Sequence, residues 1–363
     1  MITETLLRPP TAELFAEQLM QSVSAALDVF AIYLGDRLGF YRVLAEDGPL
    51  SPGQLAARTG ANERYVREWL EHQAVAGVLD VETSFPRERR FYLPPERAEV
   101  LADPDSLNYM APLAQLTAGV VAPLEQIVRV YREGGGLCFH EFGRDARQGQ
   151  ARINRPAFLK QLGPQWIAAM PDVRRRLLQS PGARIADVGC GAGWSSIGLA
   201  LTYPLVTVDG FDSDADSIRD ATGNAVEAGV SPRVTFSRRD AADPALTGFY
   251  DLVLAAECVH DMCDPVNALR TMRRLTREGG AVVVIDEKVG DRFDPQAGLV
   301  EKFMYGCSIL HCLPSAMAEQ PAAGTGTVMR ADTFRGYAKE AGFRQVEDVP
   351  IDHPFLRMYR LYA

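Results

Sequence analysis

The sequence predicts an α/β protein in which a mostly helical region precedes an open, mostly parallel sheet with helices on both faces. Two observations support this fold class. From about residue 176 onward, short apolar runs alternate with helical patterns, as they do in parallel sheets. Before that point, apolar residues recur at three- and four-residue intervals, which is typical of helices.

Composition limits the class of protein further. A chain of 363 residues can hold two domains, and 47% hydrophobic with 23% charged residues is ordinary for a globular protein. The net charge of -9 disfavours general binding to nucleic acid or to an anionic membrane surface. No apolar run approaches the roughly 18 residues of a membrane span, and the N-terminus lacks the basic-then-apolar order of a signal peptide. We therefore expect a cytoplasmic protein.

The six cysteines are scattered and form no C-x-x-C pair, which indicates free thiols in a reducing compartment. Two groups of cysteine and histidine lie close in sequence, namely Cys258, His260 and Cys263, and Cys307, His311 and Cys312. Because these spacings match no familiar zinc motif, we predict no metal site.

Residues 12–44 are predicted to be helical. One apolar stripe runs along this segment at helical spacing and contains Phe15, Leu19, Val23, Leu27, Phe30 and Leu34. The stripe is long for a helix that packs only within a small domain. Packing on a second subunit explains it equally well, so we expect a homodimer.

The following residues carry a winged-helix pattern. Ser51, Pro52 and Gln54 predict a helix with a capping box that runs to about residue 59. A second helix is predicted over residues 63–76, and its inward-facing side chains are expected to be Tyr65, Val66, Trp69 and Leu70. Two short strands near residues 78–81 and 91–93 then flank a polar loop at 87–90.

Winged helices that bind DNA present several basic side chains from the second helix. Here that helix has a mixed face, made of Glu63, Arg64, Arg67, Glu68 and Glu71. In the wing loop, Glu88 interrupts the basic residues. We therefore predict a packing and dimerisation domain over residues 1–100. A transcription regulator that senses a small-molecule effector is the alternative function.

Residues 101–175 are predicted to form a helical linker and lid, broken by glycines at 134–136. The segment 138–145 after these glycines is a candidate hinge. Phe142, Phe158 and Trp166 suit the wall of a ligand pocket, but aromatic residues at helical spacing belong more often to the core.

Residues 176–363 are predicted to form the sheet domain. We place strands at residues 184–188, 206–211, 233–237, 252–256, 281–286, 345–350 and 356–361. Ligands of such sheets bind at the carboxyl ends of the strands, so polar residues at those ends are the candidate site residues.

The first strand ends in Asp187-Val188-Gly189-Cys190-Gly191-Ala192-Gly193. Glycines allow a sharp turn and close approach of a ligand to the main chain, and the helix N-terminus that follows favours an anionic group. An ordinary strand-to-helix turn is the structural alternative. The spacing Gly-x-Gly-x-Gly differs from the Gly-x-Gly-x-x-Gly of nicotinamide-dependent oxidoreductases, which disfavours that class.

Acids also follow the later strands. Asp212, next to Ser213, comes about 20 residues after the glycine loop, where an acid can hold the two hydroxyls of a ribose. Capping of the next helix is the alternative role of Asp212. Asp240 and Ala241 follow the third strand, where a carboxylate can accept an adenine amino proton. The fourth strand is followed by Glu257, His260 and Asp261, and the fifth ends in Asp286, Glu287 and Lys288.

Together these residues resemble a class I S-adenosylmethionine-dependent methyltransferase, with its Rossmann-like sheet of seven strands. The resemblance implies that Gly189, Gly191, Gly193 and Glu257 lie near the methionine part of the cofactor, Asp212 at the ribose, and Asp240 and Ala241 at the adenine. Asp187, Cys190 and Ser213 are further candidate cofactor-binding residues.

The complete order of winged helix, helical linker and sheet domain is similar to that of bacterial small-molecule O-methyltransferases. In that family a His-Asp pair after the fourth strand contains the general base, which implies catalytic roles for His260 and Asp261. Met262 departs from the family, because an aromatic residue usually stands there. The resemblance implies methyl transfer to a small acceptor, fairly apolar or aromatic, with O-methylation favoured.

Two points stay open at this stage. His140 and His311 are rival candidates for the base. The long stretch 289–331 is rich in apolar and polarizable side chains, which suits an acceptor pocket but equally a flap that packs on the core.

Overall fold

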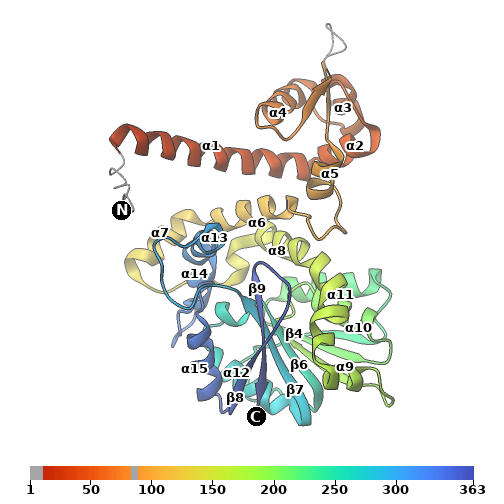
Figure 1. Cartoon of the computed structure of the whole chain (residues 1–363), viewed down its shortest axis with the longest axis vertical. Coiled ribbons are helices and arrows are strands. Elements are labelled where there is room, and N and C mark those ends of the chain that lie inside the picture. Colours follow the sequence, from red (N-terminus) through yellow and green to blue (C-terminus); the bar gives the residue numbers. More distant parts are fainter. Residues whose placement is uncertain (1–10, 83–88) are drawn as a thin grey trace, which may run out of the picture. The chain divides into compact units, whose positions relative to one another are not determined.

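The computed structural model describes residues 11–82 and 89–363 (Figure 1). The chain divides into two compact units, residues 1–118 and 119–363, and each is described by itself. The expected boundaries at residues 100 and 175 remain predictions. Among the described residues, no helix is both long enough and apolar enough to cross a membrane.

The first unit is mostly helical. Its elements are α1 (Ala12–Arg37), α2 (Phe40–Asp47), α3 (Pro52–Thr59), α4 (Glu63–Val75), β1 (Asp80–Glu82), β2 (Arg90–Tyr92), α5 (Pro95–Leu101) and the start of α6 (Ala111–Val121). The single helix expected over residues 12–44 is therefore two helices. Gly39 has φ 71, a left-handed conformation that ends the first helix and begins the second.

The winged-helix pattern is confirmed in its main parts. Ser51 and Gln54 form the expected capping box on α3, and β1 pairs antiparallel with β2. Val66, Trp69 and Leu70 of α4 are buried, whereas Tyr65 is 79% exposed, so its expected inward orientation is wrong. Tyr65 falls outside the i, i+3, i+4 row that faces the core.

The basic face that DNA binding would require is weak on α4. Arg64 lies 2.5 Å from Glu68, and Arg67 lies 2.8 Å from Glu63, so each arginine is neutralised one turn away. Residues 83–88, which include Arg87 and Glu88 of the predicted wing loop, lie outside the described residues.

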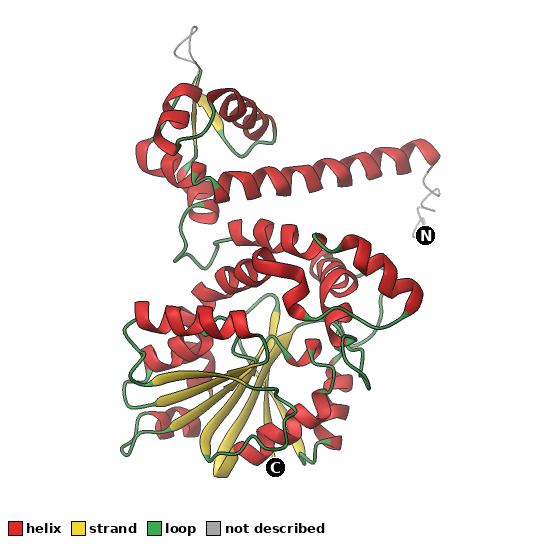
Figure 2. Ribbon diagram, turned by 180° about the vertical axis from the view of Figure 1, so that it is seen from behind, coloured by secondary structure: helices red, strands yellow, loops and turns green. Residues whose placement is uncertain are grey.

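The second unit contains the expected sheet (Figure 2). Its strands are β3 (Arg184–Val188), β4 (Thr207–Asp212), β5 (Val234–Arg238), β6 (Tyr250–Ala256), β7 (Thr276–Glu287), β8 (Gln345–Val349) and β9 (Leu356–Tyr362). The α-helices wholly within this unit are α7 (Leu124–Glu133), α8 (Gly143–Ala157), α9 (Pro171–Leu177), α10 (Trp194–Thr202), α11 (Ala215–Glu227), α12 (Pro265–Leu275), α13 (Leu299–Cys307), α14 (Leu313–Ala316) and α15 (Ala331–Glu340).

The seven strands lie in the order β5-β4-β3-β6-β7-β9-β8, and only the pairs that involve β9 are antiparallel. Strands β4 and β5 extend the sheet on one side of β3, and the chain then returns to place β6 on the other side. The neighbours β3 and β6 thus flank the point where the strand order reverses, which is where sheets of this kind bind ligands.

Successive side chains of the central strands belong alternately to two separate hydrophobic cores. Leu252 and Leu254 of β6 belong to one core, and Val253 and Ala255 belong to the other. Phe158 and Trp166 lie in the first core. Of the two roles considered for them, pocket wall and core packing, this position supports core packing. Both faces of β6 are buried, as its continuous apolar run predicts.

Candidate active site

The glycine loop joins the end of β3 to the start of α10. The Gly189 and Cys190 amides both donate to the carbonyl oxygen of Phe211, at 2.8 and 3.1 Å, which holds the loop against β4. Gly193 is the N-cap of α10 with φ 81, and a Cβ there would lie 2.6 Å from Cζ of Phe236. A Cβ on Gly191, with φ 50, would meet no atom within 4 Å. The backbone at Gly191 is therefore open to a ligand.

Asp187 lies under this loop and is fully buried. Its Oδ2 accepts hydrogen bonds from the hydroxyls of Ser195 and Ser196, at 2.5 and 2.6 Å. Its Oδ1 is buried with no hydrogen-bond partner among the described residues. Burial raises the pKa of Asp187 to about 6, although the two serine hydroxyls oppose that shift. An unsatisfied carboxylate oxygen beside an open backbone fits a ligand that donates a hydrogen bond.

Asp212 at the end of β4 is attached to the same loop. Its Oδ2 accepts from the Gly191 amide at 2.8 Å, and its Oδ1 accepts from the Asp214 amide at 2.9 Å. The following helix α11 is capped by Asp214, whose Oδ2 accepts from the Ser217 amide, so Asp212 is not its cap. Burial also raises the pKa of Asp212.

The remaining predicted cofactor residues lie farther along the same edge. Ser213 is exposed, and its carbonyl oxygen accepts a hydrogen bond from Arg238 Nε at 2.9 Å. Asp240 is exposed in the turn after β5, with its Oδ1 accepting from the Ala242 amide at 2.9 Å, and Ala241 is half-buried.

Cys258 connects the glycine loop to the segment after β6. Its thiol donates to the carbonyl oxygen of Val188, the last residue of β3, at 3.3 Å. A Cβ on Gly189 would lie 2.6 Å from Cys258 Sγ, so the two segments are in direct contact. His260, two residues further on, therefore stands beside the glycine loop.

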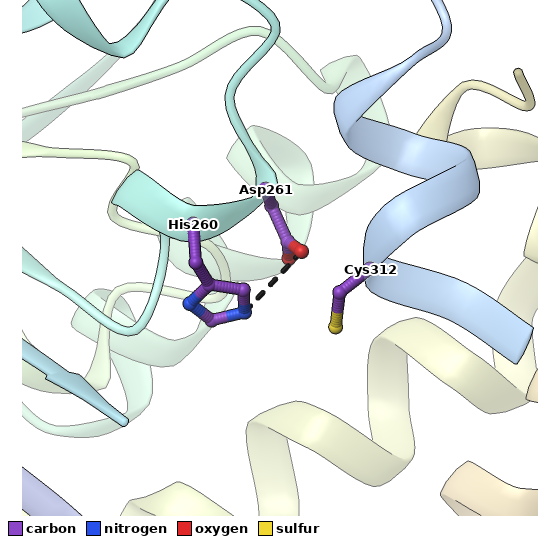
Figure 3. A group of neighbouring side chains, drawn as sticks. All are labelled: His260, Asp261 and Cys312. Atoms are coloured by element: carbon purple, nitrogen blue, oxygen red, sulfur yellow. Dashed lines mark ion pairs between the residues drawn. The ribbon is translucent and has the colours of Figure 1, made fainter. Parts of the chain in front are cut away.

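His260 is 3% exposed and belongs to a 3-10 turn, Val259–Asp261. Its Nδ1 lies 2.5 Å from Asp286 Oδ1, and its Nε2 lies 3.3 Å from Asp261 Oδ1 (Figure 3). Burial lowers the pKa of His260, but the carboxylates of Asp261 and Asp286 outweigh burial and hold the pKa well above its usual value.

No role was predicted for Asp286 from the sequence, although the residue was placed at the end of the fifth strand. Strand β7 pairs with β6, and Ile285 lies opposite Ala256. Asp286 thereby reaches the imidazole from a neighbouring strand. Its position at a strand end was the available signal, and only the pairing of β6 with β7 identifies its partner.

Glu257 begins the segment after β6 with φ 54, unusual for a residue other than glycine. Its Oε2 accepts from Asn154 Nδ2 at 3.1 Å and from Gln150 Nε2 at 3.2 Å, both on α8. Burial is the main cause that raises the pKa of Glu257 to about 7. The pKa of the nearby Glu287 is also raised, mainly by burial and next by the charge of Glu257. Helix α8, part of the predicted lid segment, thus contributes directly to this site.

The two rival histidines differ in their surroundings. His140 is exposed in a 3-10 turn, Phe139–Phe142. His311 is buried, its ring packs edge-on against Phe142 at 4.4 Å, and burial lowers its pKa. Among the described residues, neither His140 nor His311 forms an ion pair with a carboxylate, whereas His260 contacts two carboxylates.

The stretch 289–331 contributes α13, α14 and a π-helical turn, Ser308–Cys312. Two backbone hydrogen bonds attach it to the segment after β6: the Gly326 amide donates to His260 O at 3.0 Å, and the Ala323 amide donates to Cys263 O at 2.8 Å. The stretch therefore lies against the candidate base.

Two family models match the chain. Residues 179–332 match one described as "Methyltransferase domain", and residues 25–103 match one described as "Rv2258c-like winged HTH domain". The first covers β3 to β7 and the stretch that follows; the second covers α2 to α5 and part of α1.

Curated relatives are similar over part of their length. A 27-O-demethylrifamycin SV methyltransferase of Amycolatopsis mediterranei is 34% identical over 106 residues, which are 29% of this chain and 39% of that protein. A ubiquinone biosynthesis O-methyltransferase of Marinobacter nauticus is 34% identical over 105 residues, which are 28% of this chain and 43% of that protein. The chain thus spans about two fifths of the length of these relatives.

Solved structures share the fold over nearly the whole chain. Human N-acetylserotonin methyltransferase in complex with SAM has a TM-score of 0.72 at 17% identity, covering 98% of this chain and 99% of that one. A mitomycin 7-O-methyltransferase has a TM-score of 0.69 at 21% identity, covering 97% and 99%.

Alanine substitutions at Gly191 and Gly193 are expected to differ in their effects on ligand affinity and on the free energy of unfolding. We expect Gly191→Ala to cost about 1–2 kcal/mol of unfolding free energy, for its left-handed backbone alone. It should weaken binding of S-adenosylhomocysteine by at least about 10-fold, because its methyl group occupies the open approach to the main chain. Gly193→Ala adds a clash with Phe236 and should cost about 2–5 kcal/mol. Urea unfolding and calorimetric titration measure both effects, and equal binding by Gly191→Ala and wild type would contradict the first.

Asp187 should make stability depend on pH. Its folded pKa of about 6 lies above the unfolded value, so the folded state binds this proton more tightly and loses stability as pH rises through that range. The Asp187→Asn variant would keep both serine hydrogen bonds through its one amide oxygen and remove the charge. We therefore expect the unfolding free energy of Asp187→Asn, relative to wild type, to increase by about 1 kcal/mol between pH 5 and pH 8. Urea unfolding without ligand checks this; a constant difference would contradict it.

Proposed function

The chain carries an S-adenosylmethionine-dependent methyltransferase domain behind a winged-helix domain, and from this premise we propose that it methylates a hydroxyl group of a small, fairly apolar acceptor with His260 as general base. The observation that carries the proposal is the contact of His260 Nδ1 with Asp286, beside the glycine loop.

In this contact we take the Asp286 carboxylate as the acceptor and Nδ1 as the donor, so Nε2 is the position that exchanges a proton. This contact also fixes the orientation of the ring. The arrangement matches what a general base requires, a histidine oriented by a carboxylate. Asp286 acts in the proposal as a positioning residue.

Asp261 Oδ1 lies 3.3 Å from Nε2. The two carboxylates hold the pKa of His260 well above its usual value, which disfavours its action as a base while Asp261 stays beside Nε2. We infer that the acceptor hydroxyl displaces the Asp261 carboxylate from Nε2. The displacement removes one of the two charges that favour the imidazolium, and Nε2 then accepts the hydroxyl proton as the oxygen is methylated.

The residues present fit the cofactor. Gly191 offers an open backbone, Asp187 an unsatisfied oxygen, and Asp212 and Glu257 carboxylates at the neighbouring strand ends. When bound, S-adenosylmethionine supplies a methyl group already activated on a sulfonium. What the protein must add is alignment of the acceptor and removal of its proton. Asp240 and Ala241 are proposed at the adenine and Ser213 at the ribose.

The acceptor is proposed to lie against the stretch 289–331, which is hydrogen-bonded to the backbone at His260. Its helix α13 offers Phe303, 37% exposed, and Tyr305, half-buried, as apolar and aromatic contacts. The names of two relatives, which refer to a rifamycin and to ubiquinone biosynthesis, support hydroxyl-bearing aromatic or quinone-like acceptors.

Removal of the base tests this proposal. Once a panel of phenols, catechols and hydroxyquinones has identified an acceptor, His260→Ala should lower kcat by about 100-fold or more with little change in S-adenosylhomocysteine affinity. Asp286→Asn should lower kcat by a smaller factor and leave KM for the acceptor nearly unchanged. His140→Ala, at an exposed histidine outside the cluster, is the control and should match wild type. Full activity of His260→Ala would refute the role of His260.

We also propose that the protein is a homodimer in which a second copy covers the apolar face of α1. Five residues of that face are exposed by 48–62%, namely Phe15, Leu19, Val23, Leu27 and Leu34. So large an apolar row on one helix is typical of a subunit interface. Leu19→Glu with Leu27→Glu should shift the sedimentation coefficient to that of a monomer. Gln21→Glu with Ser24→Glu, also at exposed positions of α1, is the control. A wild-type monomer at micromolar concentration would contradict the proposal.

A further inference from the structure

Three side chains of different chemistry converge beside the candidate base. A ring nitrogen of His260, an Asp261 carboxylate oxygen and Cys312 Sγ all lie within 4.8 Å of one another, and Nε2 is the nitrogen that lies 3.3 Å from Asp261 Oδ1. His260 and Asp261 share one turn after β6, whereas Cys312 projects toward them from the π-helical turn that precedes α14 (Figure 3). His260 and Cys312 are buried and Asp261 is half-buried.

This donor set has the composition of a zinc site. Zn²⁺ binds imidazole nitrogen, thiolate sulfur and carboxylate oxygen in tetrahedral geometry, with bonds of about 2.0–2.3 Å that place neighbouring donors roughly 3.3–3.8 Å apart. Shifts of about 1 Å in flexible side chains bring the three donors to those distances. Nitrogen and sulfur donors disfavour Mg²⁺ and Ca²⁺, which prefer oxygen. Three protein ligands leave a fourth position for water or a further ligand.

Two further observations point to a cation at this position. Asp261 Oδ1 is buried and makes no hydrogen bond among the described residues, since its contact with His260 Nε2 is a 3.3 Å charge contact. Asp286 accepts from His260 Nδ1, which directs Nε2 toward Asp261 and Cys312. A carboxylate behind a histidine is the usual support of a metal-bound imidazole, because it fixes the ring and strengthens the donor.

We propose that His260 Nε2, Asp261 and Cys312 Sγ bind Zn²⁺ and that the metal inhibits methyl transfer. Binding releases the thiol proton of Cys312 and the proton on Nε2 to solvent, because both atoms must be free to coordinate. A coordinated Nε2 has no lone pair left to accept the acceptor's proton. His260 Nε2 can therefore act as a base or as a Zn²⁺ ligand, but not as both at once. The inhibition by Zn²⁺ rests on the proposed function of His260 as general base, whereas the binding of Zn²⁺ does not.

Binding is tested without any acceptor. Chelator competition with wild-type protein should give a 1:1 Zn²⁺ complex, and Cys312→Ser should weaken it by about 100-fold or more. Asp286→Asn, which alters only the support of the imidazole, should weaken it by about 10-fold. Co²⁺ in place of Zn²⁺ should show the near-ultraviolet charge-transfer band of a thiolate ligand, and this band should be lost in Cys312→Ser.

Cys263→Ser is the matched control, because this half-buried thiol lies close by but bonds to the Ser315 carbonyl instead. It should keep both the Zn²⁺ affinity and the Co²⁺ band. Equal Zn²⁺ affinity of wild type and Cys312→Ser, or a Co²⁺ complex without the thiolate band, would overturn the site.

Inhibition is tested separately. Micromolar Zn²⁺ should suppress the methylation rate of wild type, excess chelator should restore it, and the acceptor should protect. Tight Zn²⁺ binding with an unchanged rate would overturn the inhibition while leaving the site. Normal activity of His260→Ala would instead refute the proposed base, so the two failures are distinguishable.

Discussion

The parallel pairing of β3 with β6 and of β6 with β7 is the constraint on which the candidate site depends. Val188 lies opposite Ala255, and Ala256 lies opposite Ile285, so the three strands end at nearly the same level. The residues that follow each strand must therefore meet at one edge of the sheet. Because alternate residues of β6 pack in two different cores, a one-residue slip in register would move every side chain into the wrong core, and this keeps the site geometry stable.

Negative charge is concentrated at this edge at a considerable electrostatic cost. Asp187, Glu257 and Glu287 all have raised pKa values, mainly because burial disfavours their charged forms. Carboxyl groups in such positions are costly unless a cation or hydrogen-bond donor compensates them. The sulfonium and ammonium groups of the proposed cofactor are such partners. The same reasoning accounts for the raised pKa of His260, and it supports the proposed Zn²⁺ site at its Nε2.

The two nitrogens of His260 are held very differently. Nδ1 is anchored to Asp286, a fully buried residue at the end of a strand, whereas Nε2 faces Asp261 on a short turn and Cys312 on an irregular helix. The ring is thus fixed on its structural side and adjustable on its reactive side. Proton transfer requires this combination, because the base must keep its orientation while its partner changes.

Local patterns of the sequence were sufficient to predict the strands of the large sheet and the start of α3, but not the break between α1 and α2 at Gly39. Alternating and continuous apolar runs predicted all seven strands of the large sheet, with the largest deviation at the start of β7, which begins at residue 276 and not at 281. Ser51, Pro52 and Gln54 predicted a capped helix. These signals act between near neighbours in the chain. The glycine loop and the acids after the strands also located the edge that carries the candidate site.

The partners of the reactive groups were decided only by the tertiary structure. The pairing of β6 with β7 brings Asp286 to His260, and the packing of the 289–331 stretch brings Cys312 to Asp261. Helix α8 supplies Gln150 and Asn154 to Glu257 from far upstream. No periodicity or short spacing encodes such contacts, because they join segments that approach one another only when the whole core has packed.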